Sequence, residues 1–233
     1  MRSLIHKAKR LTAEARRRLA AGDRIFLTFD DGPLESFPGI LDLLGEYDAR
    51  ATFFLVASRI DAGNMAQVRR ALLAGHEIGN HSWSHRAFSE ITEAEIEHQI
   101  VRAHEVIDRI LRDTDGKGVQ RPEQRYFRFP WLDSGVGFRN GKVIRGSLAR
   151  RDAARRVLAG LGYRIVGIDL ESRDWAIDFE QATVPEVAER LLGARRGDVI
   201  LMHDRSGATD ILERVLPALS QRWRLAPLSA RTF

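Results

Sequence analysis

Residues 24–33 read RIFLTFDDGP, a mostly apolar run followed by two adjacent carboxylates and a Gly-Pro pair. The run 24–29 is typical of a buried β-strand, because a short apolar segment bounded by turn residues fits a sheet covered on both faces. Asp30 follows this run directly, and a buried carboxylate costs free energy unless it finds a partner. Asp-Gly-Pro is also favourable turn chemistry, so a simple turn is the alternative to a functional site.

Segments of strand and helix pattern alternate along the rest of the chain. We predict seven strands, at 24–29, 51–56, 77–80, 126–129, 163–168, 198–202 and 223–225. Helical patterns lie between them, at 37–47, 65–74, 92–112, 148–161, 184–193 and 208–220. This alternation predicts an α/β fold with a parallel sheet covered by helices, either a barrel or an open doubly wound sheet. No G-x-G-x-x-G follows the first strand and no Walker loop is present, which disfavours nucleotide binding.

The composition limits the kinds of chemistry that the chain can perform. Its 233 residues are 44% hydrophobic and 30% charged, typical of a globular protein with a sizeable core. It contains no cysteine, which excludes disulfides, thiolate metal sites and a cysteine nucleophile. Any bound metal must therefore be held by His, Asp or Glu side chains.

The positive charge is concentrated at the N-terminus. Residues 1–24 carry eight Lys and Arg against two acidic residues, whereas the remainder carries 29 basic and 30 acidic residues. The body of the protein therefore lacks the basic surface of a nucleic-acid-binding domain, and we expect no nucleic acid partner.

The N-terminal segment has the spacing of an amphipathic helix. Apolar residues recur there at helical intervals, at Leu4, Ala8, Leu11, Ala15 and Leu19. We predict a basic helix over 1–23 ahead of an α/β domain over 24–233. Residues 1–22 either pack on that domain or make a weak peripheral contact with an anionic membrane. No signal-peptide core or transmembrane stretch is apparent, so the expected location is the cytoplasm.

Reactive side chains follow five of the predicted strands. Carboxyl ends of parallel strands meet at one rim, where α/β folds place their active sites. We therefore expect these side chains to converge: Asp30 and Asp31, His81 and His85, Arg128, Glu171 with Asp174 and Trp175, and His203 with Asp204.

His81 and His85 are four residues apart, and on a helical turn they would share one face and grip one cation. With Asp31 they form a three-ligand set that leaves positions for water, as in catalytic zinc-type sites. A chance pair at this spacing is the simpler interpretation. Taken singly, Arg128 is equally a surface charge and His203 a hydrogen-bonded core histidine.

Five motifs, in order, resemble those of the polysaccharide deacetylase family, the NodB-homology carbohydrate esterases of family 4. They are Thr28-Phe29-Asp30-Asp31-Gly32-Pro33, His81-Ser82-x-x-His85, Arg128-x-Pro130-Trp131, Glu171-Ser172-x-Asp174-Trp175 and Leu201-x-His203. Together they extend from about residue 24 to the last predicted strand. The resemblance implies a distorted (β/α) barrel with fewer strands than a full eightfold one.

The resemblance also implies a metal centre and a base. Asp31, His81 and His85 would hold one divalent metal, with zinc expected first and cobalt, nickel or iron as alternatives. Asp30 would be the general base, paired with Arg128. The metal would activate a water and polarise the amide carbonyl, while the base takes the proton of the attacking water.

The remaining implied roles concern the leaving group and the substrate. His203 would be the general acid, oriented by Asp174, and the backbone N–H of Trp131 would help to form an oxyanion hole. Trp175 and Leu201 would line the pocket for the acetyl methyl group.

The implied activity is metal-dependent removal of N-acetyl groups from the amino sugars of a polysaccharide, oligosaccharide or lipid-linked glycan, with release of acetate. Trp131-Leu132 stands where the family usually has Tyr-Gly, Glu171 where it has Asp, and Arg86 where it often has Pro. These departures keep every implied catalytic side chain but put the usual substrate in question. The basic segment 132–147 suggests an anionic substrate. The alternatives are a hydrolase of formamides or cyclic amides and a non-catalytic sugar-binding barrel.

Overall fold

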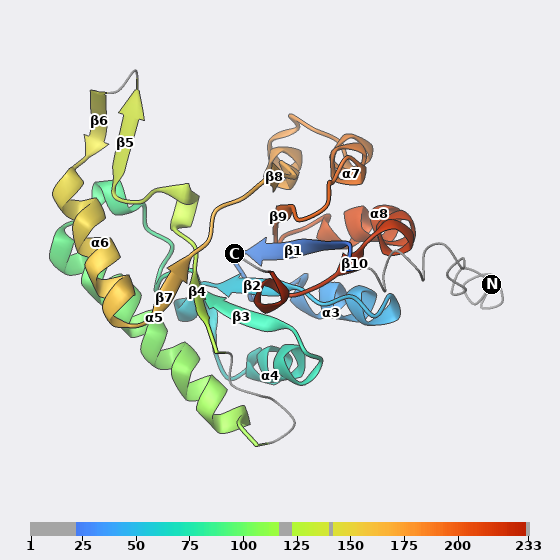
Figure 1. Cartoon of the computed structure of the whole chain (residues 1–233), viewed down its shortest axis with the longest axis horizontal. Coiled ribbons are helices and arrows are strands. Elements are labelled where there is room, and N and C mark those ends of the chain that lie inside the picture. The colour runs from blue at the N-terminus through green and yellow to red at the C-terminus, as the bar shows by residue number, and fades with distance from the viewer. Residues whose placement is uncertain (1–21, 117–122, 140–141, 232–233) are drawn as a thin grey trace. The chain divides into compact units, whose positions relative to one another are not determined.

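Strands and helices alternate along the chain as expected of an α/β protein (Figure 1). The computed structural model describes residues 22–116, 123–139 and 142–231. These residues form two units. The first contains the described residues up to Phe29, Leu34–Thr52 and the chain from Ile168 onward, and the second contains Asp30–Pro33 and Phe53–Gly167.

The first unit is built on strands β1 (Arg24–Asp30), β8 (Leu170–Glu171), β9 (Val199–His203) and β10 (Arg224–Leu225). Strand β9 lies between β1 and β8, β8 runs parallel to β9, and β10 runs parallel to β1. Every residue of β1 after the first is buried, as expected of a strand covered on both faces. Helix α8 (Ala208–Arg222) packs against both α3 (Phe37–Glu46) and α7 (Val184–Leu192).

The second unit contains strands β2 (Thr52–Leu55), β3 (Glu77–Asn80), β4 (Arg125–Phe127) and β7 (Tyr163–Ile165) in the order β2-β3-β4-β7. The β3–β4 and β4–β7 pairs are parallel. Its helices are α4 (Met65–Leu73), α5 (Glu93–Thr114) and α6 (Leu148–Gly160). A core cluster that includes Phe88, Phe127 and Phe129 joins α5 and α6 to this sheet.

The seven strands and six helices predicted from the sequence are all present, and most bounds differ by one or two residues. The largest difference is the strand predicted at 163–168, which ends at Ile165 because its partner β4 ends at Phe127. The predicted helix over residues 1–23 lies almost entirely outside the described residues. No helix within the described ranges has the length and apolar character needed to cross a membrane.

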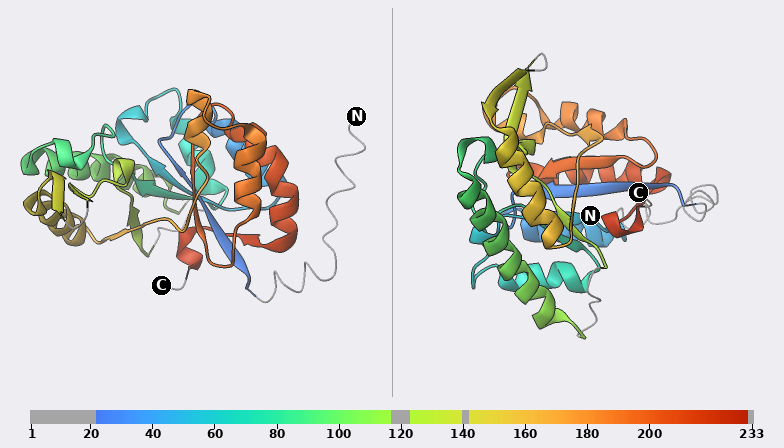
Figure 2. Two further views of the ribbon diagram at one scale, coloured as in Figure 1. Left: turned by 90° about the horizontal axis from the view of Figure 1, so that it is seen from above. Right: turned by 60° about the vertical axis from the view of Figure 1, so that its left-hand side comes forward.

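The basic segment 132–147 contains a β-hairpin that the sequence pattern did not predict. Strands β5 (Val136–Arg139) and β6 (Lys142–Gly146) pair antiparallel beside the start of α6 (Figure 2). Buried Asp133 anchors the segment, because its carboxylate accepts from the Ser89 hydroxyl at 2.5 Å and from the Gly135 N–H at 2.9 Å. Gly146 has φ 64°, and a Cβ there would collide with the Gly135 carbonyl, so only glycine closes this hairpin.

Candidate active site

The two adjacent aspartates at the end of β1 point to different partners. Asp30 is 3% exposed, and its Oδ1 accepts a hydrogen bond from Arg128 Nη1 at 2.8 Å. Asp31 adopts φ 74°, a left-handed conformation that aspartate tolerates better than most residues. Arg59 donates to the backbone carbonyl of Asp31 and helps to hold this turn. The left-handed residue allows Asp30 to pair with an arginine while Asp31 meets two imidazoles.

His81 and His85 converge, but not on the helical turn that their spacing suggested. Ser82 and His85 have φ of 70° and 60°, so the segment is an irregular turn. Side chains replace the helical hydrogen bonds here, because Asn80 Oδ1 accepts from the Ser82 N–H at 2.8 Å and Ser82 Oγ accepts from the His85 N–H at 3.1 Å. The two imidazole centroids lie 4.9 Å apart.

Asp31, His81 and His85 offer ligand atoms that all lie within 4.8 Å of one another, and they are the only such group of three among the described residues. Asp31 Oδ1 lies 2.9 Å from His85 Nε2 and 3.6 Å from His81 Nε2. It is buried and, within the described chain, accepts no hydrogen bond of acceptable geometry. A buried carboxylate oxygen between two imidazole nitrogens, without a proton donor aligned to it, fits a divalent metal centre.

The hydrogen bond at the other ring nitrogen prepares His81 for this role. His81 Nδ1 lies 2.8 Å from the carbonyl oxygen of Arg128. A carbonyl only accepts, so the N–H at Nδ1 donates to it and fixes the orientation of the ring, with Nε2 facing Asp31. Burial raises the pKa of the Asp31 carboxyl, but the two imidazoles more than offset this effect and hold that pKa below its ordinary value. The Asp31 carboxylate is therefore anionic near neutral pH.

Arg128 is fully buried and organises the same unit. Besides Asp30, its guanidinium donates to the Gly167 carbonyl at 3.2 Å and lies 4.3 Å from the centroid of the Phe54 ring. Gly79 makes room for that ring, since a Cβ at residue 79 would stand 2.6 Å from it. The alternative of a surface charge is therefore wrong for Arg128. The buried guanidinium holds the carboxylate of Asp30 in place through a charge-assisted hydrogen bond.

Trp131 lies beside the histidines with 69% of its surface exposed. Its indole Nε1 donates to the His85 carbonyl at 3.2 Å, and the two ring centroids are 5.0 Å apart. Trp131 and Leu132 have φ of 58° and 52°, two consecutive left-handed residues that a chain adopts only where the surroundings enforce it. The exposed indole supplies an apolar face next to the candidate metal ligands.

The first unit holds a different arrangement around His203. Both oxygens of Asp174 contact it, with Oδ1 2.7 Å from His203 Nδ1 and Oδ2 accepting from the His203 N–H at 2.7 Å. Ser172 Oγ also donates to Asp174 Oδ1 at 2.8 Å. Asp174 is 1% exposed, whereas the His203 side chain is 15% exposed. Asp174 therefore holds the imidazole at Nδ1, and the side chain as a whole remains partly exposed.

The other predicted substrate contacts differ in exposure. Leu201 is 4% exposed within β9, and Trp175 is partly buried in the 3₁₀ segment Asp174–Phe179. Trp175 Nε1 donates to Glu171 at 2.9 Å, so the residue that departs from the family pattern orients this indole. The sequence interpretation did not single out Asn80 or Ser172 as supporting residues, because only the folded chain brings their side chains to backbone groups and to Asp174.

An Asp-His-His group leaves coordination positions open, as in catalytic metal sites, and a buried Arg-Asp pair stands beside it. These features define the class of metal-dependent hydrolases, and comparison with known proteins specifies it further. A family model described as polysaccharide deacetylase matches residues 18–135, and the chain belongs to this family.

Named relatives and a solved structure agree with that membership. The chain is 32% identical over 206 residues to a peptidoglycan-N-acetylglucosamine deacetylase of Bacillus cereus, covering 85% of this chain and 82% of the relative. It is 29% identical to a chitooligosaccharide deacetylase of Azorhizobium caulinodans, covering 88% and 92%. A family 4 acetyl xylan esterase from Clostridium thermocellum, solved with a cobalt ion, shares 27% identity and a TM-score of 0.67 over 88% of each chain. The expected distorted barrel and the implied family are thereby confirmed.

Proposed function

We propose that this protein is a metal-dependent N-deacetylase that hydrolyses the acetamide of amino sugars in a glycan and releases acetate. The observation that carries the proposal is the group of Asp31, His81 and His85 beside the buried Asp30–Arg128 pair. The named relatives that act on peptidoglycan and chitooligosaccharides support an N-acetylated glycan as the substrate class.

Asp31, His81 and His85 are proposed to hold one divalent metal, with zinc expected first and cobalt, nickel or iron as alternatives. When bound, the metal would supply a Lewis acid that polarises the acetamide carbonyl and makes water a better nucleophile. The proton on His81 Nδ1, directed at the Arg128 carbonyl, keeps the opposite nitrogen available as a ligand.

Asp30 is proposed as the general base that removes a proton from the attacking water. Arg128 holds the Asp30 Oδ1 at 2.8 Å, and Oδ2, which lies 3.6 Å from His81 Nε2, is proposed to take this proton. The backbone N–H of Trp131 is proposed as a fixed donor to the oxyanion that forms as the carbonyl carbon becomes tetrahedral.

His203 is proposed as the general acid that protonates the departing amine. Asp174 fixes the proton on His203 Nδ1, and its negative charge favours the imidazolium form that an acid requires. Trp175 and Leu201 are proposed to line the pocket for the acetyl methyl group.

The substrate within this class is proposed to be anionic or lipid-linked. Exposed Lys142 and Arg145 lie on β6 of the hairpin, which follows the Trp131 turn along the chain. Residues 1–22 carry seven basic residues and one acidic residue, a net charge of +6, whereas the rest of the chain has a net charge of −1. A weak peripheral membrane contact through residues 1–22 is part of the same proposal. The cytoplasm is the proposed location, to be tested by cell fractionation.

An acetate-release screen tests the proposed function. Purified protein is incubated with N-acetylated chitooligosaccharides, peptidoglycan fragments and lipid-linked amino sugars, with and without added zinc or cobalt. We expect metal-stimulated acetate release from at least one glycan and none from an Asp30→Asn variant that still binds metal. Release of formate or ring opening of a cyclic amide instead would identify the alternative hydrolase. Glycan binding without release of any product would identify a non-catalytic barrel.

A further inference from the structure

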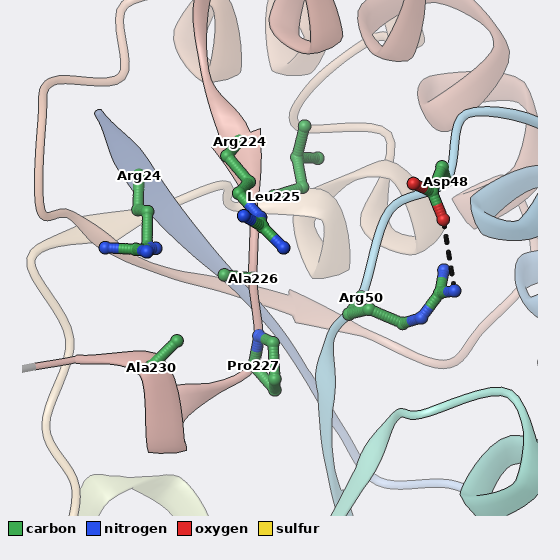
Figure 3. Close-up of a pocket in the computed structure, with 8 residues that line it drawn as sticks. All are labelled: Arg24, Asp48, Arg50, Arg224, Leu225, Ala226, Pro227 and Ala230. Atoms are coloured by element: carbon green, nitrogen blue, oxygen red, sulfur yellow. Dashed lines mark ion pairs between the residues drawn. The ribbon is translucent and has the colours of Figure 1, made fainter. Parts of the chain in front are cut away.

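A hollow of about 440 Å³ lies in the first unit, at the amino ends of β1 and β10 (Figure 3). Arg24 opens β1 and Arg224 opens β10, and the two residues are partners in the parallel register of these strands. Arg50 stands at another side of the hollow, and Ala226 and Pro227 form part of an apolar wall.

The cations around this hollow outnumber the carboxylates. Arg24, Arg50 and Arg224 line it, and Asp48 is its one acidic residue. Asp48 pairs with Arg50 at 3.1 Å. Within the described residues, neither Arg24 nor Arg224 forms an ion pair. Like charges on directly neighbouring strand positions destabilise a sheet, so this pair lacks a compensating anion.

Arg24 also has an unsatisfied hydrogen-bond donor. Its Nε is buried and, within the described part of the chain, has no acceptor. A guanidinium nitrogen only donates, so the burial of Nε is unfavourable unless a ligand supplies an acceptor. The hollow thus combines an excess of positive charge with an arginine, Arg24, that has an unsatisfied hydrogen-bond donor.

A neighbouring hollow serves as an internal comparison. It also measures about 440 Å³ and shares Arg24 and Ala230 with the first. Its further arginines are paired with acids, since Arg231 lies 3.1 Å from Asp169 and Arg196 lies 3.3 Å from Asp23. Arg24 borders both hollows, and Arg224, a second arginine that forms no ion pair within the described ranges, lines only the first.

We infer that the hollow formed by Arg24, Arg50 and Arg224 binds the phosphate group of a phosphate ester. The planar guanidinium fork matches the oxygens of phosphate, and two such groups without carboxylates provide several charge-assisted hydrogen bonds. The volume exceeds that of phosphate alone, and the wall of Ala226 and Pro227 accommodates a small organic part of the ligand. This site is independent of the proposed deacetylase chemistry, because it uses none of the residues assigned to that reaction.

The test measures phosphate binding to the full chain. Inorganic phosphate is titrated into wild-type protein by calorimetry at constant ionic strength, and the same titration is run with chloride. The variant is Arg24→Gln with Arg224→Gln, and Arg224→Gln alone serves if the double variant does not fold. The matched control is Arg155→Gln with Arg156→Gln, which removes two charges from exposed positions of α6.

We expect phosphate to bind the wild type and the control with equal affinity, and the double variant to bind at least about tenfold more weakly. The double variant leaves the candidate metal ligands unchanged. A loss of phosphate affinity in this variant therefore shows that the phosphate binds at the hollow and not at the metal centre. Equal affinity in all three proteins would overturn the inference, as would an equal response to chloride.

A second experiment distinguishes the source of the phosphate. Vesicles of phosphatidylcholine with and without phosphatidic acid are sedimented with wild type, double variant and control. Binding to the acidic vesicles that depends on Arg24 and Arg224 assigns the hollow to a lipid headgroup. If free phosphate binds but vesicle binding does not depend on Arg24 and Arg224, the hollow is assigned to a soluble phosphate ester.

Discussion

His81 and His203 both follow strand patterns in this chain, yet their Nδ1 atoms have opposite kinds of partner. His81 Nδ1 lies 2.8 Å from the uncharged carbonyl of Arg128, and His203 Nδ1 lies 2.7 Å from the carboxylate of Asp174. A carbonyl accepts the N–H at Nδ1 and orients Nε2 toward the Asp31 carboxylate, an arrangement typical of a metal-binding histidine. A carboxylate favours the protonated ring, which suits an acid. The partner of Nδ1, not the histidine itself, therefore decides which chemistry each ring can perform.

Removing the histidines beside Asp31 gives the largest expected effect. A His81→Ala, His85→Ala double variant should lose the divalent metal and nearly all acetate release, because a single carboxylate cannot retain the ion. Metal content by mass spectrometry and acetate release are measured together. His98→Ala, an exposed helical histidine outside the cluster, is the control and should change neither. Full metal retention by the double variant would disprove the assignment of these ligands.

Asp30→Asn should give the next largest effect. The general base is lost, so turnover should fall by about 10²- to 10⁴-fold, while Asp31, His81 and His85 still bind metal. Rate and metal content are measured on the same preparation. Asp108→Asn provides the matched control, since Asp108 also pairs with arginines but lies outside the cluster. Near-normal turnover by Asp30→Asn would rule it out as the base.

The charged partner of His203 should give a smaller effect and a diagnostic pH shift. In Asp174→Asn the imidazolium loses its anionic partner, so the alkaline limb of the pH–rate profile should move to lower pH with metal binding unchanged. The expected loss of rate is about 10- to 100-fold, as for other residues that orient a histidine.

A double-mutant comparison tests whether His203 and Asp174 act as one unit. Adding His203→Ala to Asp174→Asn should cost far less than His203→Ala costs in the wild type, because the two residues are expected to act together. If the alkaline limb does not move in Asp174→Asn, and the rate losses of the two substitutions multiply, the two residues do not act together. His203 would then be a hydrogen-bonded core histidine and not the general acid.

The smallest expected effect is that of deleting residues 1–22. This segment holds most of the positive charge excess but precedes every motif, so both histidine environments should be retained. A chain beginning at Asp23 should cleave a small soluble substrate at the wild-type rate. Loss of activity in a folded truncation would show that the segment contributes to the active site.

The β5–β6 hairpin and the turn from His81 to His85 are two features that the local sequence pattern did not predict correctly. Strand β6 contains two apolar residues in a row, Val143 and Ile144, between Lys142 and Arg145, and all four are exposed. It therefore lacks the alternation of polar and apolar residues that identifies a half-buried strand. The turn from His81 to His85 was expected to be helical from its spacing alone. Hydrogen bonds that the side chains of Asn80 and Ser82 accept from backbone N–H groups replaced the helix, and periodicity contains no information about such competition.

The alternation of strands and helices, the residues at the strand ends and the absence of thiol chemistry were determined by the sequence alone. These features depend on apolar periodicity and residue type, which are local properties. The tertiary structure alone decided that Arg128 is buried against Asp30, and which atom each histidine meets at Nδ1. Those partners are distant in the chain: Arg128 and Asp30 are 98 positions apart, His81 and Arg128 are 47 apart, and His203 and Asp174 are 29 apart. Contacts over such separations form only when the strands pack, so no local pattern specifies them.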